Sequence, residues 1–226
     1  MAAVIFDLDD TLYPRARYVN SGFGAVARHM GIGFGLPVDE VYARLRTAHV
    51  RGGRGRELQT MCEAYGLDTV LVPDLLQVFR KHRPEIWLSH DVPATLEGLR
   101  ARGWRTAVLT NGLPSVQAAK VRALGLDALV DHVIYADEYA EGGKPAAEPF
   151  MEALRRLEVA PQNAVMVGDD RINDIEGARA VGMRAVLLTR AERPTHDGGA
   201  DAVVSWLIDL PRIALDLVQH RMADAA

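Results

Sequence analysis

The sequence predicts an α/β protein, with a Rossmann-like parallel sheet covered by helices on both faces and a small all-α domain inserted after the first strand. Two observations support this prediction. From about residue 88 to the end, short apolar runs alternate with amphipathic stretches, which is typical of buried parallel strands joined by helices. Between residues 14 and 87 only helical periodicity remains. We therefore expect a core of residues 1–13 and 88–226 and a helical domain of residues 14–87.

Five strands are expected in the core, each an apolar run rich in β-branched residues. They span residues 4–8, 106–109, 133–135, 164–167 and 184–188. In the inserted domain, apolar faces at helical spacing predict helices within 41–48, 58–65 and 75–79. The segment "RGGRGR", residues 51–56, holds too much glycine for a helix interior and is expected to join two of these helices.

Composition excludes several classes of protein. The 226 residues are 49% hydrophobic and 25% charged, which is enough to bury a full core. A net charge of -4 argues against a nucleic-acid-binding protein, because such proteins present a basic surface. The single cysteine, Cys62, excludes an intrachain disulfide and a multi-cysteine metal site. With no signal peptide or membrane segment in the pattern, we expect a cytoplasmic monomer or homodimer that binds no membrane.

The stretch "VIFDLDDTLYP" places three aspartates, Asp7, Asp9 and Asp10, directly after an apolar run. Carboxylates at this density repel one another, so a fold would avoid the arrangement unless a cation or a reaction required it. Asp7 falls at the C-terminal end of the expected first strand, and open parallel sheets bind their ligands at that edge. This stretch therefore indicates a ligand site.

Three further polar clusters are expected at the same edge of the sheet. One follows strand 106–109, another follows strand 164–167, and the third lies in a loop with glycine and proline just before a helix. Because the carboxyl ends of parallel strands meet at one edge, all of these groups are expected to converge. The clusters are Thr110-Asn111-Gly112, Gly168-Asp169-Asp170 with Asp174, and Lys144-Pro145.

The chemistry of these clusters suits a phosphate group. Hard carboxylate ligands such as Asp7 and Asp169 suit Mg²⁺, which is usually held by one or two carboxylates together with phosphate oxygens and water. The Thr110 hydroxyl, the backbone N–H groups of the following turn and the N-terminus of the next helix predict an anion cradle. Lys144 adds a compact positive charge for the same phosphate.

Together, Asp7-x-Asp9-x-Thr11, Thr110-Asn111-Gly112, Lys144-Pro145 and Gly168-Asp169 with Asp174 resemble the four ordered motifs of the haloacid dehalogenase superfamily. The resemblance implies that Asp7 is a nucleophile forming an aspartyl-phosphate, and that Asp9 is first the general acid and then the general base. It also implies Mg²⁺ held by Asp7, Asp169 and the backbone carbonyl of Asp9. Asp174 and Thr11 would support these groups, and Thr110, Lys144 and Asn111 would hold phosphoryl oxygens.

The implied function is a Mg²⁺-dependent phosphatase acting on a small phosphorylated metabolite, either a sugar phosphate or a nucleotide monophosphate. Dehalogenases of the superfamily lack the acid found here as Asp9, because halide leaves without a proton and an alkoxide does not. A phosphomutase of the same fold and a catalytically silent binding or regulatory module remain open.

The helical insert resembles the cap of one branch of the superfamily. It carries eight arginines between Pro14 and Arg56, which would suit a substrate with a second anionic group, although a solvated surface explains them as well. Arg15, Arg17 and Tyr18 lie nearest to the first motif and are expected to reach the substrate.

Overall fold

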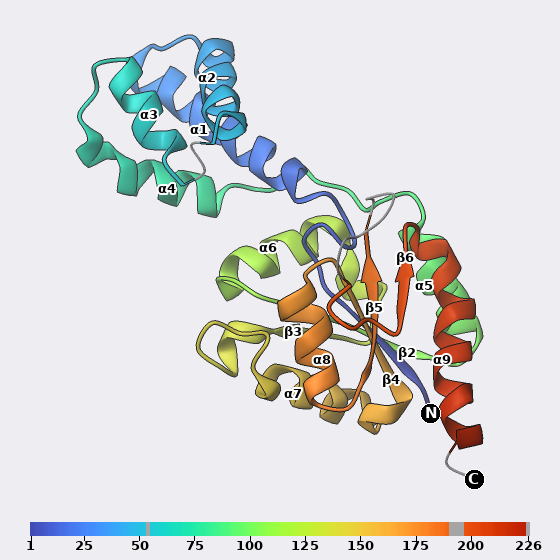
Figure 1. Ribbon diagram of the computed structural model, residues 1–226. Coiled ribbons are helices and arrows are strands. Elements are labelled where there is room, and N and C mark those ends of the chain that lie inside the picture. The colour runs from blue at the N-terminus through green and yellow to red at the C-terminus, as the bar shows by residue number, and fades with distance from the viewer. Residues whose placement is uncertain (53–54, 190–196, 225–226) are drawn as a thin grey trace. The chain divides into compact units, whose positions relative to one another are not determined.

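The computed structural model describes residues 1–52, 55–189 and 197–224 (Figure 1). The chain divides into two compact units. One combines Met1–Pro14 with Trp87–Ala226, and the other is Arg15–Ile86.

The first unit is built on a parallel sheet, which confirms the predicted fold class. Within the described residues the sheet has six strands in the order β3-β2-β1-β4-β5-β6, and every neighbouring pair is parallel. All five expected strands are present, with ends within two residues of the expected ones. The strands are β1 (Ala3–Phe6), β2 (Arg105–Thr110), β3 (His132–Tyr135), β4 (Ala164–Gly168), β5 (Arg184–Leu188) and β6 (Ala202–Val204).

Helices cover both faces of this sheet (Figure 1). Helices α5 (Val92–Ala101) and α9 (Leu210–Asp224) lie on one face, and α7 (Ala147–Leu157) and α8 (Gly177–Ala180) lie on the other. Helix α6 (Pro114–Leu124) follows β2. The main core packs strand residues against α7, whose Phe150 is fully buried. Burial of these apolar side chains supplies the main stabilisation of the unit.

Strand β1 lies in the middle of the sheet, with β2 on one side and β4 on the other. All four of its residues are buried, and Phe6 is in register with Val108 of β2 and Val167 of β4. The backbone N–H of Asp7 donates to the Val167 carbonyl at 2.9 Å, which continues the ladder by one residue beyond the strand. The ends of β1, β2 and β4 therefore present their following residues at the same edge.

The second unit is entirely helical in its described residues. Its helices are α1 (Arg15–Phe34), α2 (Val38–Val50), α3 (Glu57–Ala64) and α4 (Val72–Lys81), with a short 3-10 turn, Thr69–Leu71, before α4. Helix α1 packs closely on α4: a Cβ atom at Gly22 would lie only 2.4 Å from the Phe79 ring. The predicted "RGGRGR" link falls between α2 and α3, and two of its residues, 53 and 54, lie outside the described residues.

Two side chains named in the sequence analysis, Cys62 and Tyr18, are buried in this unit. Cys62 is completely buried in the core of the unit, as a small hydrophobic residue would be. Tyr18 is only 5% exposed, and its ring lies 5.6 Å from that of Phe79. The ring of Tyr18 is therefore used in packing, and its contact with a substrate stays a prediction. Among the described residues, no helix combines the length and the apolar character needed to cross a membrane.

Candidate active site

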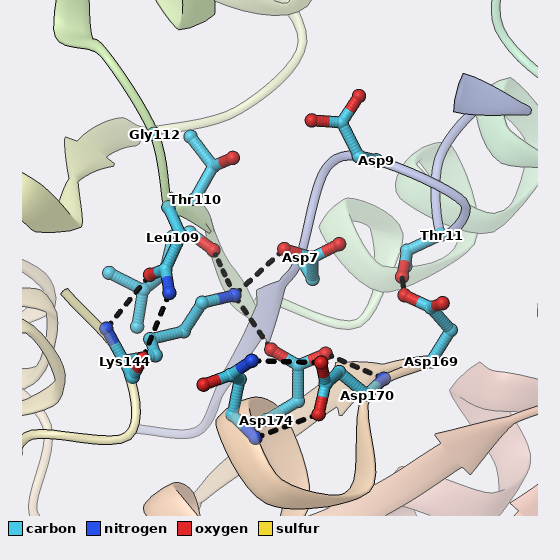
Figure 2. A network of polar contacts seen from close by, with 12 residues as sticks. Asp7, Asp9, Thr11, Leu109, Thr110, Gly112, Lys144, Asp169, Asp170 and Asp174 are labelled. Atoms are coloured by element: carbon cyan, nitrogen blue, oxygen red, sulfur yellow. Dashed lines mark hydrogen bonds and ion pairs between the residues drawn. The ribbon is translucent and has the colours of Figure 1, made fainter. Parts of the chain in front are cut away.

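Lys144 lies at the centre of the candidate site and joins three groups from different elements (Figure 2). Its Nζ atom donates to Asp7 Oδ1 at 2.7 Å, to Asp174 Oδ1 at 2.6 Å and to the Leu109 carbonyl at 2.9 Å. The lysine side chain is only 2% exposed, so this ammonium is bound by protein on all three of its N–H groups. The predicted convergence of Asp7, Lys144 and Asp174 is present in the structure.

Burial and the neighbouring charges shift the pKa values of these three groups. Burial alone would lower the pKa of Lys144, but the charges of Asp7 and Asp174 outweigh it and raise the pKa well above its usual range. Burial raises the pKa of Asp7. Burial, followed by the charge of Asp7, raises the pKa of Asp174 to about 7. Lys144 is one ammonium facing two carboxylates, so the cluster is short of one positive charge when both acids are ionised.

Asp169 completes a group of carboxylates that can hold a metal ion. One oxygen each from Asp7, Asp169 and Asp174 lie within 4.8 Å of one another. Partial burial, then the charges of Asp7 and Asp10, raise the pKa of Asp169 to about 7. The Thr11 hydroxyl donates to Asp169 Oδ1 at 3.4 Å. Several carboxylates around one ammonium form an excess of hard oxygen ligands, and this donor set fits Mg²⁺.

The neighbouring acids Asp169 and Asp170 have different surroundings. Asp169 lines a cavity of about 270 Å³ together with Asp10, Pro14, Leu188 and Thr189. Asp170 instead begins the π-helical segment Arg171–Glu176, where its Oδ1 accepts hydrogen bonds from two backbone N–H groups. Asp170 is thus a cap at the start of a helix.

A glycine is required beside Asp174. A Cβ atom at Gly168 would lie 2.0 Å from Asp174 Oδ2, so an alanine there would displace this carboxylate. Asp174 is held in the available space by Lys144 on Oδ1 and by the backbone N–H of Asp170 on Oδ2, at 3.1 Å. These two hydrogen bonds therefore fix both carboxylate oxygens of Asp174.

Asp9 lies apart from this cluster, and its carboxylate points away from Asp7 (Figure 2). Lys120 Nζ donates to its two oxygens at 2.6 and 2.9 Å. Gln117 Nε2 donates at 3.1 Å and the Tyr13 hydroxyl at 2.5 Å. Burial alone would raise the pKa of Asp9, but the charge and hydrogen bonds of Lys120 outweigh it and lower the pKa. This direction suits a base and is opposite to the one that a general acid needs.

Asn111 holds the loop that carries Lys144. Its Nδ2 donates to the Lys144 carbonyl at 2.9 Å and to the Gly142 carbonyl at 3.3 Å, and its Oδ1 accepts from the Lys144 backbone N–H at 2.8 Å. The loop approaches so closely that a Cβ at Gly143 would lie 2.5 Å from Asn111 Oδ1. The side chain of Asn111 is thus directed at the loop, a different place from the expected contact with phosphate.

The predicted anion cradle also differs at Gly112. Its backbone N–H donates to Asp137 Oδ1 at 2.9 Å, so this N–H is already used within the protein. Thr110 is 1% exposed, and its Oγ1 accepts a hydrogen bond from Gln117 Nε2 at 2.6 Å. A hydroxyl that accepts one bond can still donate its proton, so Thr110 keeps the capacity to bind an oxygen of a ligand.

Sequence reasoning missed Gln117 and Lys120, which are 2% and 4% exposed on α6. Both fall on the buried face of the helix together with Val121 and Leu124, where apolar residues are normally expected. This pattern was a usable signal, because a lysine at a core position must find a partner. Lysine is also rare here, since only Lys81, Lys120 and Lys144 occur among the 26 lysine and arginine residues.

Comparison with known proteins places the chain in a family. A model of the haloacid dehalogenase-like hydrolases matches residues 1–182. A glyceraldehyde 3-phosphate phosphatase of Methanopyrus kandleri is 32% identical over 240 positions, covering 98% of this chain and 99% of the relative. A ribulose-1,5-bisphosphate 5-phosphatase of Halopiger xanaduensis is 34% identical, covering 88% of this chain and 89% of the relative.

A solved structure is similar along the whole chain as well. The crystal structure of a 2-haloacid dehalogenase from Pseudomonas syringae pv. Tomato DC3000 aligns with a TM-score of 0.66 and 29% identity, covering 96% of this chain and 99% of that one. The four clusters anticipated from the sequence fall within the residues that the family model matches. The chain belongs to the haloacid dehalogenase-like hydrolases.

Proposed function

We propose that this chain is a Mg²⁺-dependent phosphatase that hydrolyses a small phosphorylated metabolite through an aspartyl-phosphate on Asp7. The observation that carries the proposal is the buried cluster in which Lys144 binds Asp7 and Asp174, with Asp169 close enough to share a cation with them. Phosphatases among the relatives support the reaction class.

In this mechanism, Asp7 supplies a carboxylate oxygen that attacks phosphorus, and the bond from phosphorus to the substrate oxygen breaks. Thr110 would hold one phosphoryl oxygen in line, and Lys144 would hold another by exchanging one of its three present hydrogen bonds for one to the phosphate, so that little freedom has to be lost in the transition state. Asp7, Asp169 and the backbone carbonyl of Asp9 would hold Mg²⁺, with Asp174 and Thr11 supporting them. The bound cation would offset the negative charge that builds up as the phosphate approaches Asp7.

Asp9 would transfer the proton in both halves of the reaction. It gives a proton to the oxygen that leaves, and then takes one from the water that attacks the phosphorus of the aspartyl-phosphate. The bond from phosphorus to the Asp7 oxygen breaks in this second step, which releases phosphate and restores the Asp7 carboxylate. The arrangement described here, with Asp9 bound to Lys120 and its pKa lowered, corresponds to the base form. In the acid form the carboxyl must carry a proton and turn toward the substrate.

The 2-haloacid dehalogenase among the structural relatives raises a second reaction, cleavage of a carbon–halogen bond. Asp9 argues against it, because a halide leaves without protonation and needs no acid at that position. We therefore favour phosphate esters over haloacids.

The helical unit Arg15–Ile86 is proposed to be the cap that selects the substrate, because the motifs determine the chemistry and leave specificity to other parts of the chain. Of its arginines, Arg44 is bound to Glu40 at 2.8 Å, which removes one candidate for binding a second anionic group. We place the enzyme in the cytoplasm, as a monomer or homodimer.

The direct test is release of phosphate from p-nitrophenyl phosphate with Mg²⁺ or with EDTA. We expect turnover that needs Mg²⁺ and that Asp7→Asn abolishes, while Asp127→Asn, an exposed acid, has no effect. No Mg²⁺-dependent turnover would reject the enzyme and favour a silent binding module.

Substrate class is tested with a panel that includes glyceraldehyde 3-phosphate, ribulose 1,5-bisphosphate, nucleoside monophosphates and a 2-haloacid. Phosphate release from one class of ester, with no halide release, is expected. Interconversion of sugar phosphates without release of phosphate would instead identify a phosphomutase.

A further inference from the structure

A second buried ion pair lies beside the cluster around Lys144. Lys120 on α6 is 4% exposed, and its Nζ lies 2.6 and 2.9 Å from the two oxygens of Asp9. Because one ammonium binds both oxygens, it fixes the orientation of the carboxyl group as well as its position. The steps assigned to Asp7 and Lys144 make no use of this pair.

Gln117 extends the contact from Asp9 to the phosphate-binding side of the site. Its Nε2 donates to Asp9 Oδ2 at 3.1 Å and to Thr110 Oγ1 at 2.6 Å. Gln117 and Lys120 are three residues apart on α6, so they lie on the same face of the helix. One helix face therefore holds both the carboxylate proposed to move the proton and the hydroxyl proposed to bind phosphate.

Packing does not explain these polar residues. Val121 and Leu124 already supply apolar contacts on the buried face of α6, and a methionine at position 120 would fill the space without desolvating a charge. A buried lysine is tolerated only when its partner compensates for the lost hydration, and here the partner is Asp9. The group that Lys120 directly stabilises is thus the Asp9 carboxylate.

We propose that Lys120 is a positioning residue for Asp9, which holds the carboxylate at the α6 side of the site and acts on the reaction only through it. This inference rests on the proposed function, in which Asp9 activates the water that attacks the aspartyl-phosphate. Without Lys120, Asp9 loses the group that orients it, and the step that depends on Asp9 slows.

The test uses 2,4-dinitrophenyl phosphate with Mg²⁺ in a rapid-mixing experiment. Its leaving group needs no proton, so the burst of dinitrophenolate reports the attack by Asp7 alone, and the steady-state rate includes the later step that needs Asp9 as a base. For Lys120→Met we expect a burst rate within about 3-fold of the wild type and a steady-state rate lower by about 10- to 100-fold, the scale of a misplaced catalytic group.

A double-mutant comparison separates action through Asp9 from general damage. In the Asp9→Asn background, Lys120→Met should cause no further fall in the steady-state rate, because the carboxylate it positions is gone. Lys120→Arg keeps the positive charge and should restore at least half of the steady-state rate that Lys120→Met loses. Arg122→Met removes an exposed cation from the same helix and should change neither rate.

Three results would overturn the inference. They are a burst slowed as much as the steady state, a full additional loss of steady-state rate in the Asp9→Asn background, and a Lys120→Arg variant that does not restore the steady-state rate. If Lys120→Met fails to fold, two other variants test the inference by the same criteria. They are Lys120→Arg and the double variant Asp9→Asn/Lys120→Met, which carries neither charge of the pair. Absence of Mg²⁺-dependent turnover in the wild type would reject the proposed function, and the inference with it.

Discussion

Replacing Lys144 by methionine should destabilise the metal-free protein strongly. The substitution leaves Asp7 and Asp174 buried at 8% and 1% exposure without the ammonium that binds both. Removing one partner of a buried ion pair costs about 3–5 kcal/mol. For a chain of this size, 1 kcal/mol corresponds to about 2–4 °C, so the melting temperature should fall by about 6–20 °C.

The assay is thermal unfolding followed by circular dichroism in EDTA at pH 8. The fall in melting temperature should be smaller at pH 5, because the pKa of Asp174 is raised to about 7 and a proton can then replace the missing ammonium. It should also shrink in Lys144→Met/Asp174→Asn, where one of the unpaired charges is removed. Lys81→Met, an exposed lysine of α4, serves as the control. A Lys144→Met protein that melts within 2 °C of the wild type at pH 8 would refute this account of the site.

Three further predictions follow from the same geometry. Gly168→Ala should lower both Mg²⁺ affinity and turnover, the latter by about 100-fold, because the new Cβ would lie 2.0 Å from Asp174 Oδ2; a Mg²⁺ titration checks it. Asn111→Ala should lower turnover by about 10-fold or more, because it releases the loop that carries Lys144. Asn111→Asp keeps the acceptor for the Lys144 N–H and should lower turnover less; steady-state kinetics with Mg²⁺ compare the two variants. In EDTA, stability should fall as pH rises from about 4 to 8, because Asp169 and Asp174, with pKa values raised to about 7, bind protons in the folded state that the unfolded chain has released. Mg²⁺ should therefore raise the melting temperature more at pH 8 than at pH 5, and an equal rise at both would contradict this.

The strands of the core were predictable because parallel strands buried on both faces appear as continuous apolar runs. Strand β6 was missed, since it has three residues and its Val203 is 42% exposed, which gives no such run. Helix α1 produced no clear apolar face in the sequence, because its 20 residues contain several glycines, each a weak helix former. Tertiary contacts, such as that of Gly22 with the Phe79 ring, make up for this weakness.

In the site, Asp7, Lys144 and Asp174 were predictable because each stands beside a strand end or a loop with glycine and proline. The direction in which a side chain or a backbone N–H points was harder to predict from the sequence. Composition marks residues 110–112 as a turn, but it does not reveal that the Gly112 N–H is taken by Asp137, a residue 25 positions away. The Lys120–Asp9 pair joins residues 111 positions apart, and only the folded sheet brings them together.

The order of strands in the sheet also constrains how the protein can be made. Strand β1 leaves the ribosome first, yet its two neighbours are β2, which begins at Arg105, and β4, which begins at Ala164. Its second edge therefore stays unpaired until β4, the fourth strand of the sheet in chain order, has been synthesised as well. An apolar strand with open edges can pair with other chains, so this interval is when the nascent protein is most exposed to aggregation. The strand that ends beside Asp7 thus depends on partners far along the chain.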